Sequence, residues 1–129
     1  MKLLCVDPAC VEEFWPHVAP LIESALKRSG NFSEVRSDLM GGFALLWIVW
    51  ADAIKAVVVT QLTEKNGSKF CTIVACAGHG FSDWKHLYLQ LEAYAKAEGC
   101  KAMRIYGRLG WKRMLDGYRV RSVTLEKVL

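Results

Sequence analysis

Residues 69–107 read KFCTIVACAGHGFSDWKHLYLQLEAYAKAEGCKAMRIYG, and this stretch carries the strongest information about the fold. Lys69–Ala77 is rich in β-branched and small apolar residues, as in a buried strand. A glycine-containing turn leads into an expected helix over Trp84–Glu98, where apolar residues recur at helical spacing until Gly99. Lys101–Gly107 is a second strand. A strand–helix–strand unit forms a right-handed crossover, so the two strands are expected to be parallel.

Two more strands precede this unit and make an antiparallel meander with it. The expected strands are Phe43–Trp50 and Ile54–Leu62, separated by a short turn. The nearly continuous apolar character of Ile54–Leu62 indicates a strand covered on both faces. Asn66-Gly67 is a strong hairpin signal between Ile54–Leu62 and Lys69–Ala77, and such short connections join only antiparallel strands. The sequence therefore predicts a mixed sheet with helices on both faces.

Two helices are expected ahead of the meander. Apolar residues recur at helical spacing over Cys10–Arg28. Pro16 and Pro20 fall inside that pattern, and an interior proline costs about 3 kcal/mol, so a break or kink is expected between them. Ser33 is a suitable N-cap for a second, shorter helix over Glu34–Met40.

Shorter elements are expected near the two ends of the chain. Lys2–Val6 is typical of a first strand, and Trp111–Leu115 of a short helix. Tyr118–Val128 has an alternating pattern and is expected to be a closing strand. The fold class is thus α/β with a mixed sheet, in the order β-α-α-β-β-β-α-β-α-β. The chain of 129 residues is expected to form one domain over residues 1–129.

Composition excludes several classes of protein. Apolar residues make up 53% of the chain and charged residues 23%, an ordinary globular composition. The longest apolar run, Phe43–Ala51, is about half of the ~20 residues that a membrane-spanning helix needs. The first apolar stretch stops at Asp7, too early for a secretory signal, so a cytoplasmic protein without membrane contact is expected.

The five cysteines are expected to be reduced thiols. Their odd number, without a secretion signal, argues against a disulfide framework. Cys71 and Cys76 stand five residues apart in one expected strand, so they should point to opposite faces of the sheet. No Cys-x-x-Cys pair and no histidine cluster occurs, and no metal site is expected.

Positive charge is concentrated towards the C-terminal end. Residues 101–129 hold eight Lys and Arg residues against Asp116 and Glu126, whereas residues 1–100 hold nine against eleven Asp and Glu residues. A basic C-terminal quarter indicates an acidic or phosphate-bearing partner, and the alternative is a solvated basic face.

Three short motifs in the last third of the chain resemble a known superfamily. Gly99–Ile105 resembles the helix end and fifth strand of the GNAT superfamily of N-acetyltransferases, and Gly117–Val120 resembles the Gly-Phe motif that starts its last strand. Gly107–Arg113 resembles a Gly-Arg-x-Gly-Trp stretch of small GNAT-like proteins of phages and prophages. The order of strands and helices agrees over almost the whole chain. The resemblance implies a GNAT-like fold and acetyl-CoA as cofactor.

The resemblance also implies where acetyl-CoA would bind. In the family, a Gln/Arg-x-x-Gly-x-Gly/Ala loop at the N-terminus of the long helix holds the pyrophosphate through backbone N–H groups. Here the match runs over Ala75–Gly80 or, in another register, over Ala77–Ser82. The candidate cofactor-binding residues of the loop are Ala77, Gly78, His79, Gly80, Phe81 and Ser82. An alanine replaces the family's Gln or Arg, and the glycines are equally explained by a turn that needs a positive φ. Arg108 and Arg113 flank the family's cofactor cleft, where they would meet the 3′-phosphate or an acidic partner.

Catalytic residues carry weaker signals. Many family members place a tyrosine four residues before the Gly-Phe motif, and that position is Arg113 here. The nearby phenols are Tyr106 and Tyr118, and each is either a catalytic acid or a packing residue. His79 beside the pyrophosphate loop is the other catalytic candidate, as a titratable group, and its alternative is an exposed loop residue.

These patterns support competing functions. The first is an acetyl-CoA-dependent N-acyltransferase that transfers the acyl group directly to an unidentified small-molecule or protein amine, mainly by positioning the reactants. The second is a catalytically degenerate GNAT-fold protein of phage origin that binds a protein or nucleic acid through its basic C-terminal face. The third is an unrelated mixed α/β domain with the same element order.

Overall fold

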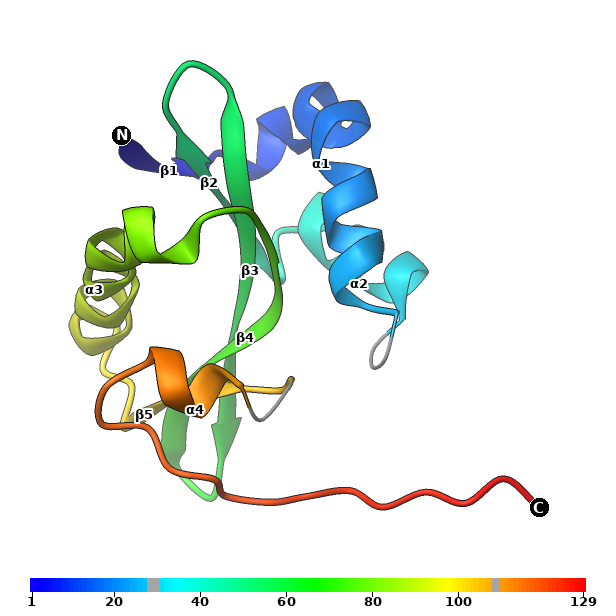
Figure 1. Ribbon diagram of the computed structural model, residues 1–129, viewed down its shortest axis with the longest axis vertical. Coiled ribbons are helices and arrows are strands. Elements are labelled where there is room, and N and C mark those ends of the chain that lie inside the picture. The colour runs from blue at the N-terminus through cyan, green and yellow to red at the C-terminus, as the bar shows by residue number, and fades with distance from the viewer. Residues whose placement is uncertain (28–30, 108–109) are drawn as a thin grey trace.

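The computed structural model describes residues 1–27, 31–107 and 110–129 (Figure 1). The elements in chain order are β1 (Lys2–Val6), the 3₁₀ helix η1 (Pro8–Cys10), α1 (Val11–Ala25), α2 (Phe32–Met40), β2 (Leu45–Trp50), β3 (Ile54–Lys65), β4 (Ser68–Gly78), α3 (Phe81–Ala97), β5 (Ala102–Ile105) and α4 (Trp111–Met114). Apart from the short η1, this order agrees with the expected one as far as α4.

The five strands of the described residues form one sheet in the order β1-β2-β3-β4-β5. The β2–β3 and β3–β4 pairings are antiparallel and β4 pairs with β5 in parallel, as the sequence predicts. β1 pairs with β2, also antiparallel, and the sequence made no prediction for this pair. The β3–β4 hairpin turns at Asn66-Gly67, whose φ angles of 54° and 78° match the twist that a two-residue hairpin turn requires. α3 supplies the crossover between the two parallel strands.

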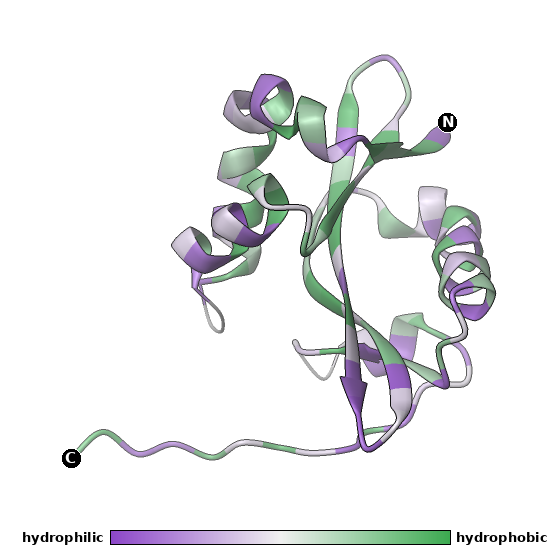
Figure 2. Ribbon diagram, turned by 180° about the vertical axis from the view of Figure 1, so that it is seen from behind, coloured by the Kyte–Doolittle hydropathy of each residue, from purple (hydrophilic) through white to green (hydrophobic). Residues whose placement is uncertain are grey.

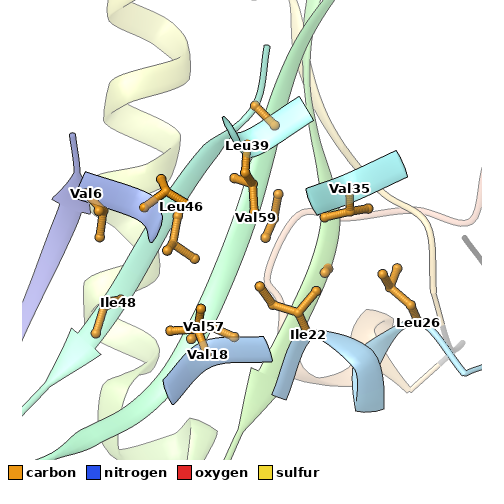
Figure 3. Close-up of a cluster of buried hydrophobic side chains, with 13 residues drawn as sticks. Val6, Val18, Ile22, Leu26, Val35, Leu39, Leu46, Ile48, Val57 and Val59 are labelled. Carbon is orange, nitrogen blue, oxygen red and sulfur yellow. The ribbon is translucent and has the colours of Figure 1, made fainter. Parts of the chain in front are cut away.

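Helices cover both faces of the sheet (Figure 1). On one face, Val18 and Ile22 of α1 and Leu39 of α2 lie over Val57 and Val59 of β3 (Figure 3). All five of these side chains are fully buried. Burying a Val, Leu or Ile side chain contributes about 1.5–3 kcal/mol, so this cluster fixes α1 and α2 on the sheet.

α3 and α4 cover the opposite face. Leu87 and Leu91 of α3 and Leu115, which follows α4, belong to a second buried cluster with Val58 and Ile73 of the sheet. Because Val57 and Val58 belong to different clusters, β3 is buried on both faces, as its apolar run predicts. The strands in the centre of the molecule are correspondingly apolar (Figure 2).

A β-bulge interrupts β4 at Val74. Ile73 pairs with Thr60 and Ala75 with Val59, so Val74 is an extra residue without a partner in β3. Val74 and Ala75 both face α1 and α2, whereas Ile73 and Cys76 face α3. The bulge corrects the prediction for the cysteines: Cys71 alternates in step with Ile73, so it shares a face of the sheet with Cys76.

α1 runs without interruption through Pro16 and Pro20, so the expected break is not observed. Both prolines are exposed, and each removes only one hydrogen bond, to Glu12 and Pro16 respectively, whose carbonyls water can reach. The buried Val18 and Ile22 on the opposite side hold the helix against the sheet. α1 ends at Ala25 with Leu26 as its C-cap, before the expected end near Arg28, which itself lies outside the described residues.

The N-cap of α2 also differs from the prediction. Asn31, not Ser33, precedes the helix, and its side-chain oxygen accepts the N–H of Glu34 at 3.1 Å. Ser33 lies inside the first turn. Asn and Ser are both good N-cap residues. Asn31 takes this position because the N–H of Glu34, three residues later, lies within reach of its side-chain oxygen.

The expected closing strand over Tyr118–Val128 is not formed. These residues have no regular secondary structure, and from Arg119 onward each is exposed. Figures 1 and 2 both show this segment running past the end of the sheet and away from the molecule. A strand is stabilised by hydrogen bonds to a neighbouring strand rather than by its own propensity. None of the described strands forms such bonds with this segment.

Within residues 1–27, 31–107 and 110–129, no helix combines the length and the apolar character needed to cross a membrane.

Gly78 at the end of β4 provides a test of the packing. It has a φ of 154°, and a Cβ atom added there would stand 2.4 Å from the Cβ of Ala56 in β3. We predict that Gly78→Ala lowers the free energy of unfolding in urea by about 3 kcal/mol, because the two strands cannot separate without losing core contacts.

Gly110→Ala is the matched control. Gly110 has a helical backbone conformation with φ −57°, and no described atom lies within 4 Å of an added Cβ. This variant should unfold within about 0.5 kcal/mol of the unchanged chain. Equal stability of the two variants would contradict the close approach of β3 and β4 at Gly78.

Candidate functional site

The candidate site begins where β4 and β5 separate. β5 pairs with β4 only over Ala102–Ile105, and the last pair is Ile73 with Ile105. The bulged residue Val74 comes next in β4, so the bulge and the separation coincide. From Val74 to Gly78, β4 has no described neighbour on the side away from β3, and backbone groups on that edge are free. We call this opening the β4–β5 fork.

The turn between β4 and α3 presents backbone N–H groups at the end of the fork. α3 begins at Phe81, one turn earlier than predicted, with Gly80 as a left-handed N-cap (φ 64°). Asp83 N–H donates to the carbonyl of Gly80 at 2.8 Å and closes the first turn. The N–H groups of Gly80, Phe81 and Ser82 have no partner among the described residues. Three donors at the positive end of a 17-residue helix suit an anion.

The remaining residues of the expected loop, His79, Ala77 and Gly78, take part in contacts with β3. The N–H of His79 donates to the carbonyl of Lys55 at 3.2 Å. Ala77 and Gly78 belong to the β3–β4 ladder. The free donors therefore lie at the start of α3 rather than in the first half of the expected loop. The His79 side chain is exposed beside them.

A small cavity of about 280 Å³ lies beside this turn and is lined by Met1, Lys55, His79, Gly80, Asp83 and Trp84. Trp84 is buried, and its indole Nε1 has no hydrogen-bond partner among the described residues. In the same buried cluster, Trp47 Nε1 donates to Thr60 Oγ1 at 2.9 Å. An unsatisfied buried donor costs about 1–3 kcal/mol, so Trp84 Nε1 is a polar group that the described residues leave unpaired at that cost.

Charges of both signs border the cavity. A Cβ atom added to Gly80 would stand 3.0 Å from Oδ2 of Asp83, so this carboxylate lies beside Gly80. It disfavours an anion at the same donors. Lys55 lines the cavity from the β3 side and has the opposite effect.

Aromatic rings connect the start of α3 with α4. The Phe81 ring meets Trp84 edge-on at a centroid distance of 4.6 Å and Trp111 at 5.4 Å. Such pairs contribute about 0.5–1.5 kcal/mol each beyond area burial. They place α4 beside the turn, with Arg113 exposed on it. Arg108 lies outside the described residues.

The two candidate tyrosines have different environments. Tyr106 follows β5, is exposed and has no hydrogen-bond partner among the described residues. Tyr118 is half-buried; its hydroxyl donates to Glu92 Oε2 at 2.8 Å and lies 3.0 Å from the hydroxyl of Tyr88. Burial, together with the Glu92 carboxylate, raises the pKa of Tyr118 above its ordinary value. Tyr118 is therefore a neutral phenol that joins the C-terminal segment to α3.

No group of three or more metal-ligating side chains occurs in the part of the chain that the structure describes. Burial raises the pKa of Cys76 to about 12 and that of Cys71 to about 11. Both thiols are therefore protonated near neutral pH, and neither is suited to be a nucleophile.

Lys55, Asp83 and Trp84 are the site residues that sequence reasoning missed. Trp84 belongs to the apolar pattern of its helix, which indicates burial rather than a binding site. No local signal marks Lys55, because it reaches the turn from β3 through the folded sheet.

No protein-family model and no curated protein sequence matches the chain. Solved structures do match it over nearly its full length. One is a GNAT family acetyltransferase from Staphylococcus aureus, with a TM-score of 0.66, 15% identity and 100% of both chains covered.

Two further matches are N-acetyltransferases that are named for their substrates. The ribosomal-protein-alanine N-acetyltransferase from Brucella melitensis has a TM-score of 0.68 and 14% identity, covering 99% of this chain and 96% of its own. The glucosamine-6-phosphate N-acetyltransferase from Arabidopsis thaliana has a TM-score of 0.64 and 15% identity, covering 98% and 97%. The chain therefore has the mixed α/β fold of GNAT acetyltransferases. The narrower resemblance to phage proteins stays a prediction.

The Tyr118 hydroxyl allows a test of the contact between the C-terminal segment and α3. We predict that Tyr118→Phe lowers the free energy of unfolding by about 1–2 kcal/mol, because Glu92 loses its donor. Tyr106→Phe removes an exposed hydroxyl without a described partner and should leave the stability unchanged. Chemical denaturation of the two variants measures the difference, and equal midpoints would refute the hydrogen bond to Glu92.

Proposed function

We propose that this chain is an acetyl-CoA-dependent N-acetyltransferase whose cofactor lies in the β4–β5 fork. The observation that carries the proposal is the coincidence of three features: the Val74 bulge, the end of β4–β5 pairing and the free N–H groups at the start of α3. Together they offer an open strand edge that leads directly to an anion site. The fold shared with GNAT acetyltransferases supports this reading, although a fold alone does not establish an activity.

The donors at the turn suit the pyrophosphate of the cofactor. The N–H groups of Gly80, Phe81 and Ser82 point from a helix N-terminus, where the helix dipole favours negative charge. Lys55 adds a cation from β3. The fork edge at Val74–Gly78 offers backbone groups to the amide-containing arm of the cofactor. Arg108 and Arg113 stay the candidates for its 3′-phosphate.

Acetyl-CoA would supply an acetyl group activated as a thioester. In direct transfer, the amine nitrogen bonds to the carbonyl carbon, the carbon–sulfur bond breaks, and the amine gives up a proton while the sulfur gains one. The chain's contribution is to hold the two reactants in place and to exclude water. The raised pKa values of Cys71 and Cys76 agree with a route that uses no acyl-enzyme.

His79 is the side chain best placed to take the amine proton, since it is exposed beside the turn. Tyr118 fits a proton-donating role less well, because its proton is engaged by Glu92. Tyr106 is unpaired among the described residues and follows the strand that forms one side of the fork. The acceptor is a small-molecule or protein amine.

Asp83 favours a second candidate function. Its carboxylate lies beside Gly80, one of the three donors, and an alanine stands where the family has its Gln or Arg anchor. A GNAT-fold protein without cofactor would bind an acidic partner through the exposed Arg113, Arg119 and Arg121. This function predicts affinity for a polyanion such as heparin that falls steeply with salt. Affinity unchanged between 50 and 200 mM salt would count against it.

Calorimetric titration with acetyl-CoA tests the first function. We predict saturable binding that Asp83→Asn tightens about fivefold, because removing a charge beside the pyrophosphate is worth about 1 kcal/mol. Asp38→Asn is the matched control: Asp38 lies on α2, on the other face of the sheet, and its removal should leave the affinity unchanged. Absence of binding at millimolar acetyl-CoA would reject the proposal.

A further inference from the structure

Arg104 is a cation that stands directly before the β4–β5 fork. It lies on β5 beside Thr72 of β4, one residue ahead of the last pair of the two strands, Ile73 with Ile105. Met103 and Ile105, on either side of it in the chain, pack against the buried cluster beneath α3. Because side chains alternate along a strand, Arg104 faces the other side of the sheet, which carries α1 and α2.

The Arg104 guanidinium is restrained but has no acidic partner. Its central carbon, Cζ, lies 3.7 Å from the centre of the Phe70 ring, and this ring is itself buried in β4. A cation in contact with an aromatic ring is attracted to it, so the ring restricts where the guanidinium can lie. None of the described residues forms an ion pair or a side-chain hydrogen bond with Arg104. Its N–H groups are therefore available to a carboxylate or a phosphate, which guanidinium groups bind through two parallel hydrogen bonds.

An open groove of about 1990 Å³ gives a ligand access to this guanidinium. Phe70, Val74 and Tyr106 also line it, so the groove reaches from Arg104 to the start of the fork. Arg104 and Tyr106 are two residues apart, which is about 7 Å along an extended chain. This length suits a small molecule with an anionic group at one end and an amine at the other.

The groove as a whole carries charges of both signs. Its carboxylates are those of Glu34, Asp38 and Glu92. Its cations, which outnumber them, are Lys65, Lys96, Lys101, Arg104, Lys112, Arg119 and Arg121. A groove of this kind admits a molecule that is itself both cationic and anionic. Arg104 differs from most of the other cations in its contact with a buried ring and in its place beside the last β4–β5 pair.

We propose that Arg104 binds a carboxylate or phosphate group of the amine that this chain acetylates. The inference rests on the proposed acetyl transfer. The amine enters from the side of the sheet that carries α1 and α2, because Met103 and Ile105 of β5 pack beneath α3 on the other side. Its anionic group pairs with the guanidinium, and its nitrogen then lies at the fork. Arg104 thereby determines specificity, since it separates anionic amines from neutral ones of the same size.

Titrations of the nitrogen-15-labelled chain, followed by NMR without acetyl-CoA, test the binding step. The probes are two pairs of amines that differ in the anionic group: β-alanine with β-alaninamide, and O-phosphoethanolamine with ethanolamine. We expect an anionic member to shift the Nε–Hε signal of Arg104 with a dissociation constant on the order of 1 mM, and its neutral partner to leave the signal unchanged. A response to one pair alone would support the proposal and identify the anion as carboxylate or phosphate.

Arg104→Gln should weaken the binding of the anionic amine about tenfold or more, because a charged donor pair is lost. Arg36→Gln is the matched control. Arg36 of α2 also lies over an aromatic ring, that of Trp15 at 5.6 Å, but it does not line the groove, so its loss should leave the affinity unchanged. Arg104→Lys keeps the charge without the paired donors and should bind more weakly than the unchanged chain but more tightly than Arg104→Gln. Thermal midpoints of the three variants show that each remains folded.

Transfer rates measured with acetyl-CoA separate binding of the anion from a purely structural role. Arg104→Gln should raise KM for the anionic amine about tenfold and leave KM for acetyl-CoA and for the neutral amine unchanged. Three results would each overturn the proposal: equal responses to both members of each pair, no saturable shift up to about 50 mM amine, or unchanged affinity in Arg104→Gln. Saturable binding at Arg104 in a chain that binds no acetyl-CoA would support the anion site and reject the acetyl transfer, so the two failures are distinguishable.

Discussion

Val74 has no partner in β3, and this one unpaired residue sets the course of the strands on both sides of it. The bulge turns β4 away from β5 directly after the pair Ile73–Ile105. It also shifts the alternation of β4, so that Ala75 faces α1 and α2 while Cys76 faces α3. The two buried clusters, which hold the helices in place, are thus filled in a register that the bulge dictates. The fork and the turn that follows it are consequences of the same distortion.

The site that results is made mainly of backbone groups, and its side chains have mixed effects. Gly80, Phe81 and Ser82 offer N–H groups at a helix N-terminus, and Lys55 adds positive charge. Asp83 opposes both. The helix dipole and Lys55 attract an anion at the turn, whereas the Asp83 carboxylate beside Gly80 repels it. The helix dipole, the lysine and the carboxylate each contribute about 1 kcal/mol at a solvated site, and their sum decides how tightly an anion is held.

Local patterns predicted the architecture well and the site only in part. The meander, the crossover and the burial of β3 on both faces follow from the Asn66-Gly67 turn and from apolar periodicity, and the structure confirms them. Nothing in Ile73-Val74-Ala75 marks a bulge, because all three residues suit a regular strand. The hydrogen bond from the His79 N–H to the carbonyl of Lys55 joins two strands of the folded sheet, so no local sequence pattern predicts it. The prediction of a last strand was wrong for the same reason: strand propensity does not provide a neighbour.

The backbone nature of the fork and the turn has a consequence for how such proteins diverge. A ligand held by N–H and C=O groups places few demands on the side chains around it, beyond glycine where space is short and apolar residues where the core needs them. Chains can then exchange most of their residues and keep the same donors in the same place. This is consistent with a chain that matches no protein-family model and no curated protein sequence and yet superposes, at about 15% identity, on acetyltransferases from bacteria and a plant.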